Sequence, residues 1–537
     1  MTDSNQQSAL SKEQIDSVVA LYSNGQYQEA INQIKVLNES HPNTPFLFNL
    51  IGACYKSLGH LEGSVQMFER AVNIKSDYAE AHKNLGITLR DIGQLDNAVE
   101  SLNNAIAIDP NYVDAHYNLA ITLKDLNHLD KAVKSYNKVI ELNPNFVQAH
   151  NNLGNIYKDL EQSESAIQSY TKAIEIKPDF AHAHNNLGNA FKDLENYKDA
   201  IKSYKKAIAI NPNFSEAHNN LGSIFNDLKQ LDKAIDAFEK AIALKSNFAE
   251  AHNNLGNSLR GLGRFDGAVK YYKQAIDLKP DYYLAHNNLG LLLMGLGEIN
   301  KAISCFKTAI SIKPDYAEAH NYLGNAFNIL GKIKKGAKCY EKAIEINPKF
   351  AEAYNNLGNM FKKLKERNKA HLCYKQAISI KPDMDFLFGT LFNNKMNLAH
   401  WSNYSKNLKE LTRKINNNEK TIGPFSLLGL IDDPALQRRA SEIFTQYHYP
   451  NNYNLQNIPT YSLHHKIRIG YFSGDFKIHP VAYLTAELYE LHNRDHFEIH
   501  AFSFGPDTND EMNLRIKTGV DHFHNVALMS NKEIALL

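Results

Sequence analysis

The sequence predicts a mostly α-helical protein, in which an α-solenoid is followed by a helical connector and by part of an α/β lobe. Two observations carry this prediction. A short pattern, AHNNLG, returns with a constant period of 34 residues over most of the chain, and such a period is typical of helical repeats. After residue 466, short apolar segments alternate with an amphipathic segment, which is typical of a parallel βαβ unit.

The repeat is marked by a small residue at a fixed position. No insertion interrupts the phase between residues 11 and 384, which predicts eleven units of 34 residues. Ala120 takes the place of glycine in one unit. The glycines of the other units are Gly52, Gly86, Gly154, Gly188, Gly222, Gly256, Gly290, Gly324 and Gly358.

Each unit is predicted to contain two helices. In the unit around Gly222, apolar and small residues recur at offsets of 3, 4 and 7, which places them on one face of a helix. The second half of the unit repeats this spacing at Ala234, Phe238 and Ala241. Most units end in proline, such as Pro212, which stops the second helix before the next unit begins.

This helix–turn–helix unit resembles the tetratricopeptide repeat (TPR), and the resemblance implies a right-handed superhelix. Histidine replaces the tryptophan that the family often has at the fourth position. Equivalent residues of stacked helices lie on the order of 10 Å apart, which is too far for one zinc ion, so no metal site and no cofactor are expected. The histidines are His82, His116, His150, His184, His218, His252, His286 and His320.

The four cysteines also follow the repeat. Cys305, Cys339 and Cys373 are separated by 34 residues each, and Cys54 stands alone. A disulfide framework or a zinc site uses other spacings, so we expect reduced thiols and a cytoplasmic protein.

The composition argues against several partners and locations. The chain has 537 residues, and 59 Lys+Arg against 58 Asp+Glu give a net charge of +1. Proteins that bind nucleic acid or anionic membranes usually show a basic excess, so neither partner is expected. The chain has no run of 18 apolar residues, which predicts no transmembrane helix. The N-terminus is polar, so we expect residues 1–10 to form a disordered tail rather than a secretory signal.

Polar residues recur on the other face of the first helix. Because amides both donate and accept hydrogen bonds, a ladder of asparagines in a solenoid groove can bind the backbone of an extended peptide. The first series comprises Asn84, Asn118, Asn152, Asn186, Asn220, Asn254, Asn288 and Asn356. A second series, three residues on, comprises Asn155, Asn189, Asn257, Asn325 and Asn359.

An acidic series lies on the same helix face, seven residues after the first asparagines. It comprises Asp91, Asp125, Asp159, Asp193 and Asp227. These carboxylates can select basic or hydroxyl side chains of a bound peptide, or they can simply solvate the face. The asparagines likewise have an alternative role, which is to satisfy polar groups between the repeats.

The connector is predicted over residues 385–460, where the period fails. Residues 417–423 are expected to form a loop, and Asp433 is expected to cap a helix that has Pro434 at its first position. Residues 449–460 are rich in Pro and Asn, which is typical of a linker.

The α/β part is predicted over residues 461–537. A strand KIRIGYFS with Ile467, Ile469 and Tyr471 in alternation, a helix from Val481 and a strand FEIHAFSF form a Rossmann-like βαβ unit. A helix DEMNLRIKTGV and a short strand DHFHNV follow, and residues 530–533 match a capping box that opens another helix. Three strands do not complete a doubly wound sheet, so we expect this to be the front part of a longer protein.

The loop after the first of these strands holds the candidate catalytic residues. Asp475 and His479 follow the strand directly. Ligands of α/β proteins bind at the carboxyl ends of the strands, which favours a substrate site there.

The order of repeats, connector, IGYFSGDFKIHPVAYL and LHNRDHFEIHAFSFGPD resembles the protein O-GlcNAc transferase family, including its bacterial SPINDLY-like members. The resemblance implies a glycosyltransferase lobe that transfers a sugar from UDP-GlcNAc to Ser or Thr of a polypeptide. It places His479 beside the donor sugar, and it assigns acceptor binding to the asparagine ladder. Animal members have a second histidine four residues later, where this chain has Tyr483, so the donor is an open question.

Two functions therefore remain open from the sequence. In the first, the chain is the N-terminal part of a transferase that uses UDP-GlcNAc or GDP-fucose. On that hypothesis, residues 1–537 bind peptides without turnover, because the nucleotide-binding lobe is missing. In the second, the chain is a scaffold, and protein binding in the groove is its whole function.

Overall fold

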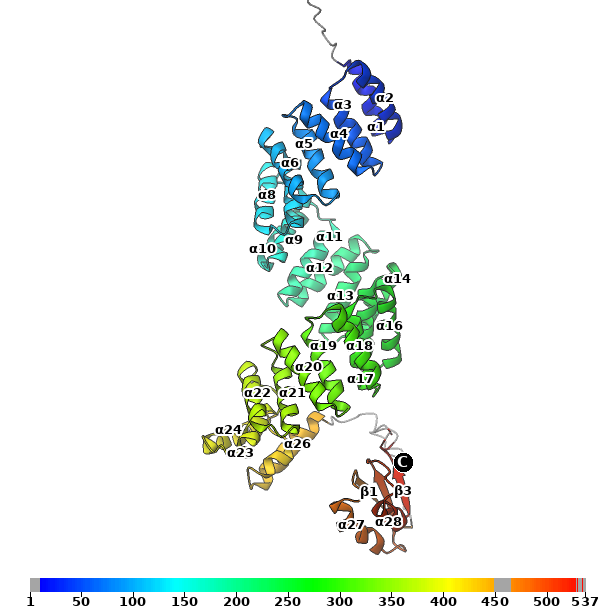
Figure 1. The fold of residues 1–537 in the computed structure, drawn as a ribbon, viewed down its shortest axis with the longest axis vertical. Coiled ribbons are helices and arrows are strands. Elements are labelled where there is room, and N and C mark those ends of the chain that lie inside the picture. Colours follow the sequence, from blue (N-terminus) through cyan, green and yellow to red (C-terminus); the bar gives the residue numbers. More distant parts are fainter. Residues whose placement is uncertain (1–9, 449–464, 528, 530–533, 535–537) are drawn as a thin grey trace, which may run out of the picture. The chain divides into compact units, whose positions relative to one another are not determined.

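The computed structural model describes residues 10–448, 465–527, 529 and 534 (Figure 1). The chain divides into two compact units, which are described separately below: residues 1–414 with 425–430, and residues 415–424 with 431–537. Within the described residues, no helix is long and apolar enough to span a membrane. The expected tail at residues 1–10 lies, except for Leu10, outside the described part.

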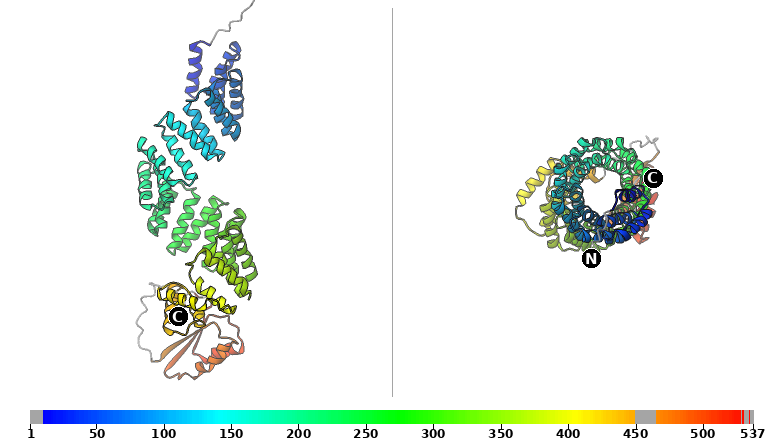
Figure 2. Two further views of the ribbon diagram at one scale, coloured as in Figure 1. Left: turned by 90° about the vertical axis from the view of Figure 1, so that its left-hand side faces the viewer. Right: turned by 90° about the horizontal axis from the view of Figure 1, so that it is seen from above.

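The repeats fold into consecutive helix pairs, which confirms the predicted α-solenoid. In the described chain, α1 to α22 form eleven pairs whose helices wind about a common axis, as the view from above in Figure 2 shows. Their bounds are α1 (Lys12–Ser23), α2 (Tyr27–Ser40), α3 (Pro45–Ser57), α4 (Leu61–Ile74), α5 (Ala79–Asp91), α6 (Leu95–Ile108), α7 (Val113–Asp125), α8 (Leu129–Leu142), α9 (Val147–Asp159), α10 (Ser163–Ile176), α11 (Ala181–Asp193), α12 (Tyr197–Ile210), α13 (Ser215–Asp227), α14 (Leu231–Leu244), α15 (Ala249–Gly261), α16 (Phe265–Leu278), α17 (Tyr283–Gly295), α18 (Ile299–Ile312), α19 (Ala317–Ile329), α20 (Ile333–Ile346), α21 (Ala351–Lys363) and α22 (Arg367–Ile380).

The repeated glycine lets the two helices of a pair approach closely. A Cβ atom on Gly188 would lie 2.6 Å from the ring of Tyr204, and one on Gly222 would lie 2.8 Å from the ring of Phe238. Real Cβ atoms do not approach aromatic carbons so closely, so these positions require glycine while the ring stays in place.

The repeated histidine joins each first helix to the loop before it. In all eight units, histidine Nε2 donates a hydrogen bond to the backbone carbonyl six residues earlier, at 2.9 to 3.2 Å. In His218 the acceptor is Pro212, whose ring ends the preceding unit. The histidine series therefore stabilises the turns between repeats, as the structural interpretation of the sequence expected.

Four further helices follow the repeats: α23 (Leu387–Asn397), α24 (Tyr404–Asn416), α25 (Pro424–Leu428) and α26 (Pro434–His448). The predicted cap is confirmed, because Asp433 Oδ1 accepts hydrogen bonds from the backbone N–H groups of Ala435 and Leu436 at 3.0 and 3.1 Å. The predicted linker at 449–460 lies, by its whole length, outside the described residues.

Within the described residues, the α/β lobe contains a three-stranded parallel sheet with the helices α27 and α28 packed on it. Its elements are β1 (Ile467–Ser473), α27 (Pro480–Leu491), β2 (Phe497–Ser503), α28 (Glu511–Gly519) and β3 (His522–Asn525). The strand order is β1-β2-β3, and both pairings are parallel, which confirms the predicted βαβ unit. The capping box predicted at 530–533 lies beyond the described residues.

One face of the sheet forms the core of the lobe. Ile499 and Ala501 of β2 are fully buried there against Ala482 and Ala486 of α27 and Ile516 of α28. Ile467, Ile469 and Tyr471 alternate along β1 as predicted. Ile469 and Tyr471 pack half-buried against the core, whereas Ile467 at the start of the strand is 64 % exposed.

Candidate functional site

The first asparagine series links each repeat to the one before it. In six repeats the side-chain NH₂ donates to the Oδ1 of an asparagine 35 residues earlier, at 2.9 to 3.1 Å. In α11, Asn186 donates to Asn151, which is 8 % exposed. Two members differ, because Asn118 donates to the carbonyl of Asp114 and Asn152 donates to the hydroxyl of Tyr117.

The accepting asparagines were missed by the sequence analysis. Most of them precede the series directly in the doublet Asn-Asn, and this doublet was the signal that could have revealed them; Asn49 and Asn321 stand at the same position before Leu50 and Tyr322. They are Asn49, Asn151, Asn185, Asn219, Asn253 and Asn321, and all are buried. A buried amide oxygen needs a donor, so this bond gives the first series a structural role alongside any role in binding.

The bond between repeats also orients the amide. Because Nδ2 of Asn220 points to Asn185, its Oδ1 points the other way, and the side chain is only half-buried. Among the described residues, no protein group donates to Oδ1 of Asn186, Asn220 or Asn288. These three side chains therefore carry acceptors that are free to receive a peptide N–H. Asn152 and Asn254 differ, because their Oδ1 atoms accept from the preceding asparagine at 3.3 and 3.5 Å.

The second asparagine series serves the core of each pair. In five repeats its Oδ1 accepts the hydroxyl proton of a buried tyrosine from the second helix, at 2.7 to 2.8 Å. These pairs are Tyr170–Asn155, Tyr204–Asn189, Tyr272–Asn257, Tyr340–Asn325 and Tyr374–Asn359.

The repeats that lack the asparagine support the pairing of this asparagine with a buried tyrosine. Where the second helix has Phe or Leu, the first helix has another residue. The pairs are Phe68 with Ala53, Leu102 with Ile87, Phe238 with Ser223 and Phe306 with Leu291. Tyr136, opposite Ile121, is the exception, and its hydroxyl interacts with Asn152 of the next repeat instead. The second series therefore follows the chemistry of the core rather than that of a groove.

The aspartate series is paired with lysines across the repeats. A lysine four residues after the marker glycine or alanine reaches the aspartate of the next repeat. The pairs are Lys56–Asp91 at 2.9 Å, Lys124–Asp159 at 3.6 Å, Lys158–Asp193 at 3.5 Å and Lys192–Asp227 at 3.9 Å. These charges offset each other, which weakens the expectation that the aspartates select basic side chains of a ligand.

The cysteines of the repeats are free, and Cys54 is fully buried. Burial raises the pKa of the Cys54, Cys339 and Cys373 thiols to about 11. At neutral pH these side chains are therefore protonated, which makes them poor nucleophiles and poor metal ligands.

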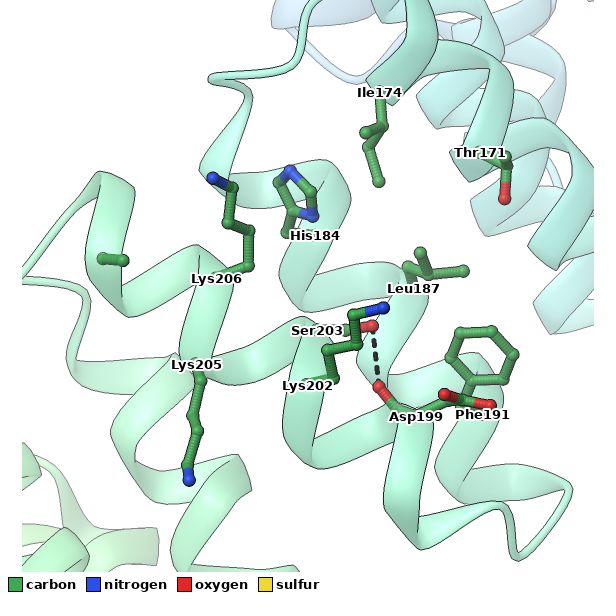
Figure 3. A pocket seen from close by; sticks show the side chains of 11 residues that line it. Thr171, Ile174, His184, Leu187, Phe191, Asp199, Lys202, Ser203, Lys205 and Lys206 are labelled. Carbon is green, nitrogen blue, oxygen red and sulfur yellow. Dashed lines mark hydrogen bonds between the residues drawn. The ribbon is translucent and has the colours of Figure 1, made fainter.

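A pocket of about 780 Å³ lies in the middle of the solenoid, between the second helices α10 and α12 and against α11 (Figure 3). Its floor is apolar, with Leu187 and Phe191, and its rim carries Lys202 and Lys206. It contains neither the asparagine series nor a candidate catalytic residue of the α/β lobe, so it does not bear on the chemistry expected there.

His479 is held at the start of α27, directly after the loop that follows β1. It is the N-cap residue of this helix, and its Nδ1 accepts a hydrogen bond from the backbone N–H of Val481 at 3.2 Å. This bond requires a lone pair on Nδ1, so the neutral ring carries its proton on Nε2. His479 can therefore donate a hydrogen bond from Nε2 to a bound group.

Asp475 lies close to His479 but is not bonded to it. Its Oδ2 is 3.8 Å from His479 Nδ1, and both side chains are about 40 % exposed, at 42 % and 39 %. Because Nδ1 accepts from Val481, the carboxylate does not orient the ring as in a catalytic triad. The structure thus places the two predicted residues together without an acid–base relay between them.

The loops that follow β1 and β2 contact each other closely beside His479. A Cβ atom on Gly505 would lie 2.1 Å from the carbonyl oxygen of Gly474, and the N–H of Phe504 donates to the carbonyl of Ser473 at 3.0 Å. Asp510 caps α28 and also accepts from the N–H of Ile478 at 3.1 Å. These contacts fix the backbone that leads into His479.

Tyr483 stands one turn after His479 on α27. Its hydroxyl donates to Glu511 Oε1 of α28 at 3.2 Å, and this hydrogen bond raises the pKa of the phenol. Tyr483 is therefore tied to the neighbouring helix and does not offer an imidazole-like base at that position.

Comparisons with known proteins agree with both parts of the chain. Eight segments between residues 88 and 365, more than half of the chain, match the family described as TPR repeat. Residues 47–78 and 351–384 match the family described as Tetratricopeptide repeat. Residues 442–535 match the family described as Glycosyl transferase family 41.

A curated relative is similar to a short part of the chain. The chain is 36 % identical over 70 residues to the Arabidopsis thaliana protein named "Probable UDP-N-acetylglucosamine--peptide N-acetylglucosaminyltransferase SEC". This match covers 13 % of this chain and only 7 % of that relative.

Two solved structures are similar to part of the solenoid. They are titled "Crystal structure of MamA" and "Crystal structure of MamA protein", with 28 % and 30 % identity and a TM-score of 0.29 each. They cover 30 % and 32 % of this chain, and 94 % and 92 % of their own chains. Taken together, the family matches show that the chain belongs to the tetratricopeptide-repeat proteins, and that its C-terminal segment is similar to glycosyl transferase family 41.

Proposed function

We propose that the protein is the part of a protein O-GlcNAc transferase that captures a polypeptide in its solenoid and begins the catalytic lobe. The observation that carries this proposal is the occurrence of both elements in one chain: residues 88–365 match the TPR repeat, and residues 442–535 match glycosyl transferase family 41. The reaction is the transfer of a sugar from a nucleotide-sugar to a Ser or Thr hydroxyl.

His479 is the proposed catalytic residue of this part of the chain. It caps α27 at the carboxyl edge of the sheet, where ligands of parallel α/β proteins bind. Its Nε2–H supplies a hydrogen bond to an oxygen of the donor, which stabilises the negative charge that develops on the leaving group. Asp475 Oδ2 lies 3.8 Å from His479 Nδ1, so the carboxylate stands beside the ring without bonding to it.

The first asparagine series is the proposed peptide-binding ladder. Asn186, Asn220 and Asn288 donate to the preceding repeat and keep Oδ1 free, so these acceptors are already oriented before the peptide arrives. Such a column accepts backbone N–H groups and reads little of the sequence of the peptide. The aspartates of the neighbouring series, including Asp125, Asp159 and Asp193, contribute only a weak preference, because the last two pair with lysines.

The free and buried thiols support a cytoplasmic location, since a chain folded in an oxidising compartment would be expected to use its cysteines in disulfides. The donor is UDP-GlcNAc on this proposal. GDP-fucose is the alternative donor, which the replacement of the second histidine by Tyr483 leaves open.

The test begins with the gene. Sequencing beyond codon 537 distinguishes the transferase from the scaffold: an open frame that continues into a second nucleotide-binding half supports transfer, and a stop codon supports a scaffold. With the continued chain in hand, His479→Ala is expected to lower sugar transfer by about 100-fold, the scale of one lost transition-state donor. His496→Ala, an exposed histidine before β2, is the matched control and should leave transfer unchanged.

A further inference from the structure

Strands β2 and β3 of the α/β lobe carry a cluster of histidines on the face of the sheet that α27 and α28 do not cover. Along β2, Ile499 and Ala501 are fully buried against the helices, so Glu498 and His500 point to the opposite face. His500 and His522 are directly paired across the β2–β3 ladder, which brings their rings together with 4.5 Å between centroids.

The ligand atoms of three of these residues converge. Single atoms of Glu498, His500 and His522 all lie within 4.8 Å of one another. Glu498 Oε1 is 3.0 Å from His522 Nε2 and 3.3 Å from His500 Nε2. Ligand atoms about 2.1 Å from a tetrahedral ion are roughly 3.4 Å apart. Two of the three distances between the ligand atoms of this cluster are already close to that value.

One atom of this cluster has no partner of its own. Nε2 of His500 is buried, and no described residue forms a hydrogen bond with it, although Glu498 Oε1 lies nearby in unsuitable geometry. A buried ring nitrogen without a partner costs stability, and a cation between Nε2 and Oε1 would satisfy it.

The surrounding residues supply what a metal site needs beyond its ligands. His500 Nδ1 lies 3.1 Å from Nε2 of His524, a contact that fixes the ring and directs Nε2 at the cluster. Arg468 Nε donates to Glu498 Oε2 at 3.0 Å, which holds the carboxylate ionised and leaves Oε1 for the histidines. His522 is the more exposed ring, and its ligand atom lies within 4.8 Å of that of His500.

We propose that Glu498, His500 and His522 bind a divalent first-row cation of the Zn²⁺ class, with His524 as a positioning residue and one coordination position open to water. Two imidazoles and one carboxylate are the ligand types that such ions prefer. The ion joins β2 to β3 on the uncovered face of the sheet, so its binding stabilises the lobe. The proposal is independent of the transferase reaction, because the cluster and His479 lie in different parts of the sheet: the cluster on its uncovered face, His479 at the carboxyl edge of β1.

The first test measures Zn²⁺ binding to the full chain by competition with a chromophoric chelator. His500→Gln and His522→Gln are expected to lower the affinity by more than 100-fold, and His524→Gln by about 10- to 100-fold, as expected for a positioning residue. The matched control is His496→Gln, which removes an exposed histidine at the start of the same strand and should change the affinity by less than twofold. Equal affinity in the ligand variants and in the control would overturn the proposal.

A second measurement needs no substitution, so it holds even if a variant fails to fold. Diethyl pyrocarbonate modifies accessible imidazoles, and mass spectrometry reports the extent at each histidine. Added Zn²⁺ should slow the modification of His522 and His500 several-fold and leave His496 unaffected. Identical modification of His522 with and without Zn²⁺ would contradict the site.

Discussion

Two adjacent repeats differ in whether a buried ring carries a hydroxyl, and this difference explains the second asparagine series. In the repeat of α11 and α12, Tyr204 is fully buried and its hydroxyl donates to Asn189 at 2.7 Å. In the repeat of α13 and α14, the equivalent residues are Phe238, also buried, and Ser223. A buried hydroxyl is tolerated where the first helix supplies an acceptor, so the asparagine accompanies the tyrosine.

The comparison separates two kinds of recurring asparagine that look alike in the sequence. One kind follows the core and is absent where the core has no hydroxyl. The other kind, including Asn186 and Asn220, is present in both repeats and bonds to the preceding repeat in both. This second kind is present whether or not the core carries a hydroxyl, and in Asn186 and Asn220 it keeps an acceptor free for a ligand.

The largest effect is expected where the two repeats are alike. Gly188→Val and Gly222→Val both place side-chain atoms within about 3 Å of a buried ring, since the Cβ alone would lie 2.6 and 2.8 Å away. We expect each to destabilise its repeat by roughly 3 kcal/mol. Hydrogen exchange of the amides in α12 and α14 measures this local loss. A marked difference between the two variants would mean that the hydroxyl, and not only the ring, sets the spacing.

The next effect is expected in the tyrosine repeat alone. Asn189→Ala leaves the hydroxyl of Tyr204 buried without an acceptor, and we expect a loss of about 2 kcal/mol in the free energy of opening of α12. Ser223→Ala is the matched control in the phenylalanine repeat and should cost less than about 0.5 kcal/mol. The double variant Asn189→Ala, Tyr204→Phe should recover most of the loss, and failure to recover it would assign another role to Asn189.

A smaller effect is expected when the phenylalanine repeat is given a hydroxyl. Phe238→Tyr should cost about 1 kcal/mol, because the new hydroxyl is buried without the asparagine. Tyr136 shows that an asparagine of the next repeat can serve in its place, which limits the loss. Adding Ser223→Asn should restore the hydrogen-exchange protection of α14. If the double variant lost as much protection as Phe238→Tyr alone, the asparagine would not be what a buried tyrosine hydroxyl requires.

The smallest effect is expected for the charges that span the repeats. Asp193→Asn removes the ion pair with Lys158 at 3.5 Å, in which both side chains are about 40 % exposed. Such pairs contribute less than about 1 kcal/mol and are screened by salt. Thermal unfolding at low and high salt measures the loss, which should vanish at high salt; a loss that persists there would show that Asp193 acts by more than its charge.

Much of the solenoid could be predicted, because the same positions recur in eleven units and each recurrence tests the others. The helix pairs, the glycine contacts and the structural role of histidines such as His218 follow from this repetition. The partners of the asparagines could not be predicted in the same way. Asn186 bonds to a residue 35 positions earlier, and its orientation depends on the stacking of two repeats.

The lobe was predicted less completely, because its candidate residues occur only once. The strands, the helix after His479 and the proximity of Asp475 followed from local patterns. The bond of His479 to the backbone of Val481, which determines its tautomer, depends on the cap geometry of α27. The cluster of Glu498, His500 and His522 was missed, since its ligands meet only when β2 and β3 pair in register.

The central claim is that the first asparagine series binds the backbone of a peptide through its free Oδ1 atoms. It is tested most directly by the affinity of the full chain for an extended peptide selected from a random library. The triple variant Asn186→Ala, Asn220→Ala, Asn288→Ala should bind at least tenfold more weakly, as expected for the loss of several hydrogen bonds. An affinity unchanged in a folded triple alanine variant would contradict the claim.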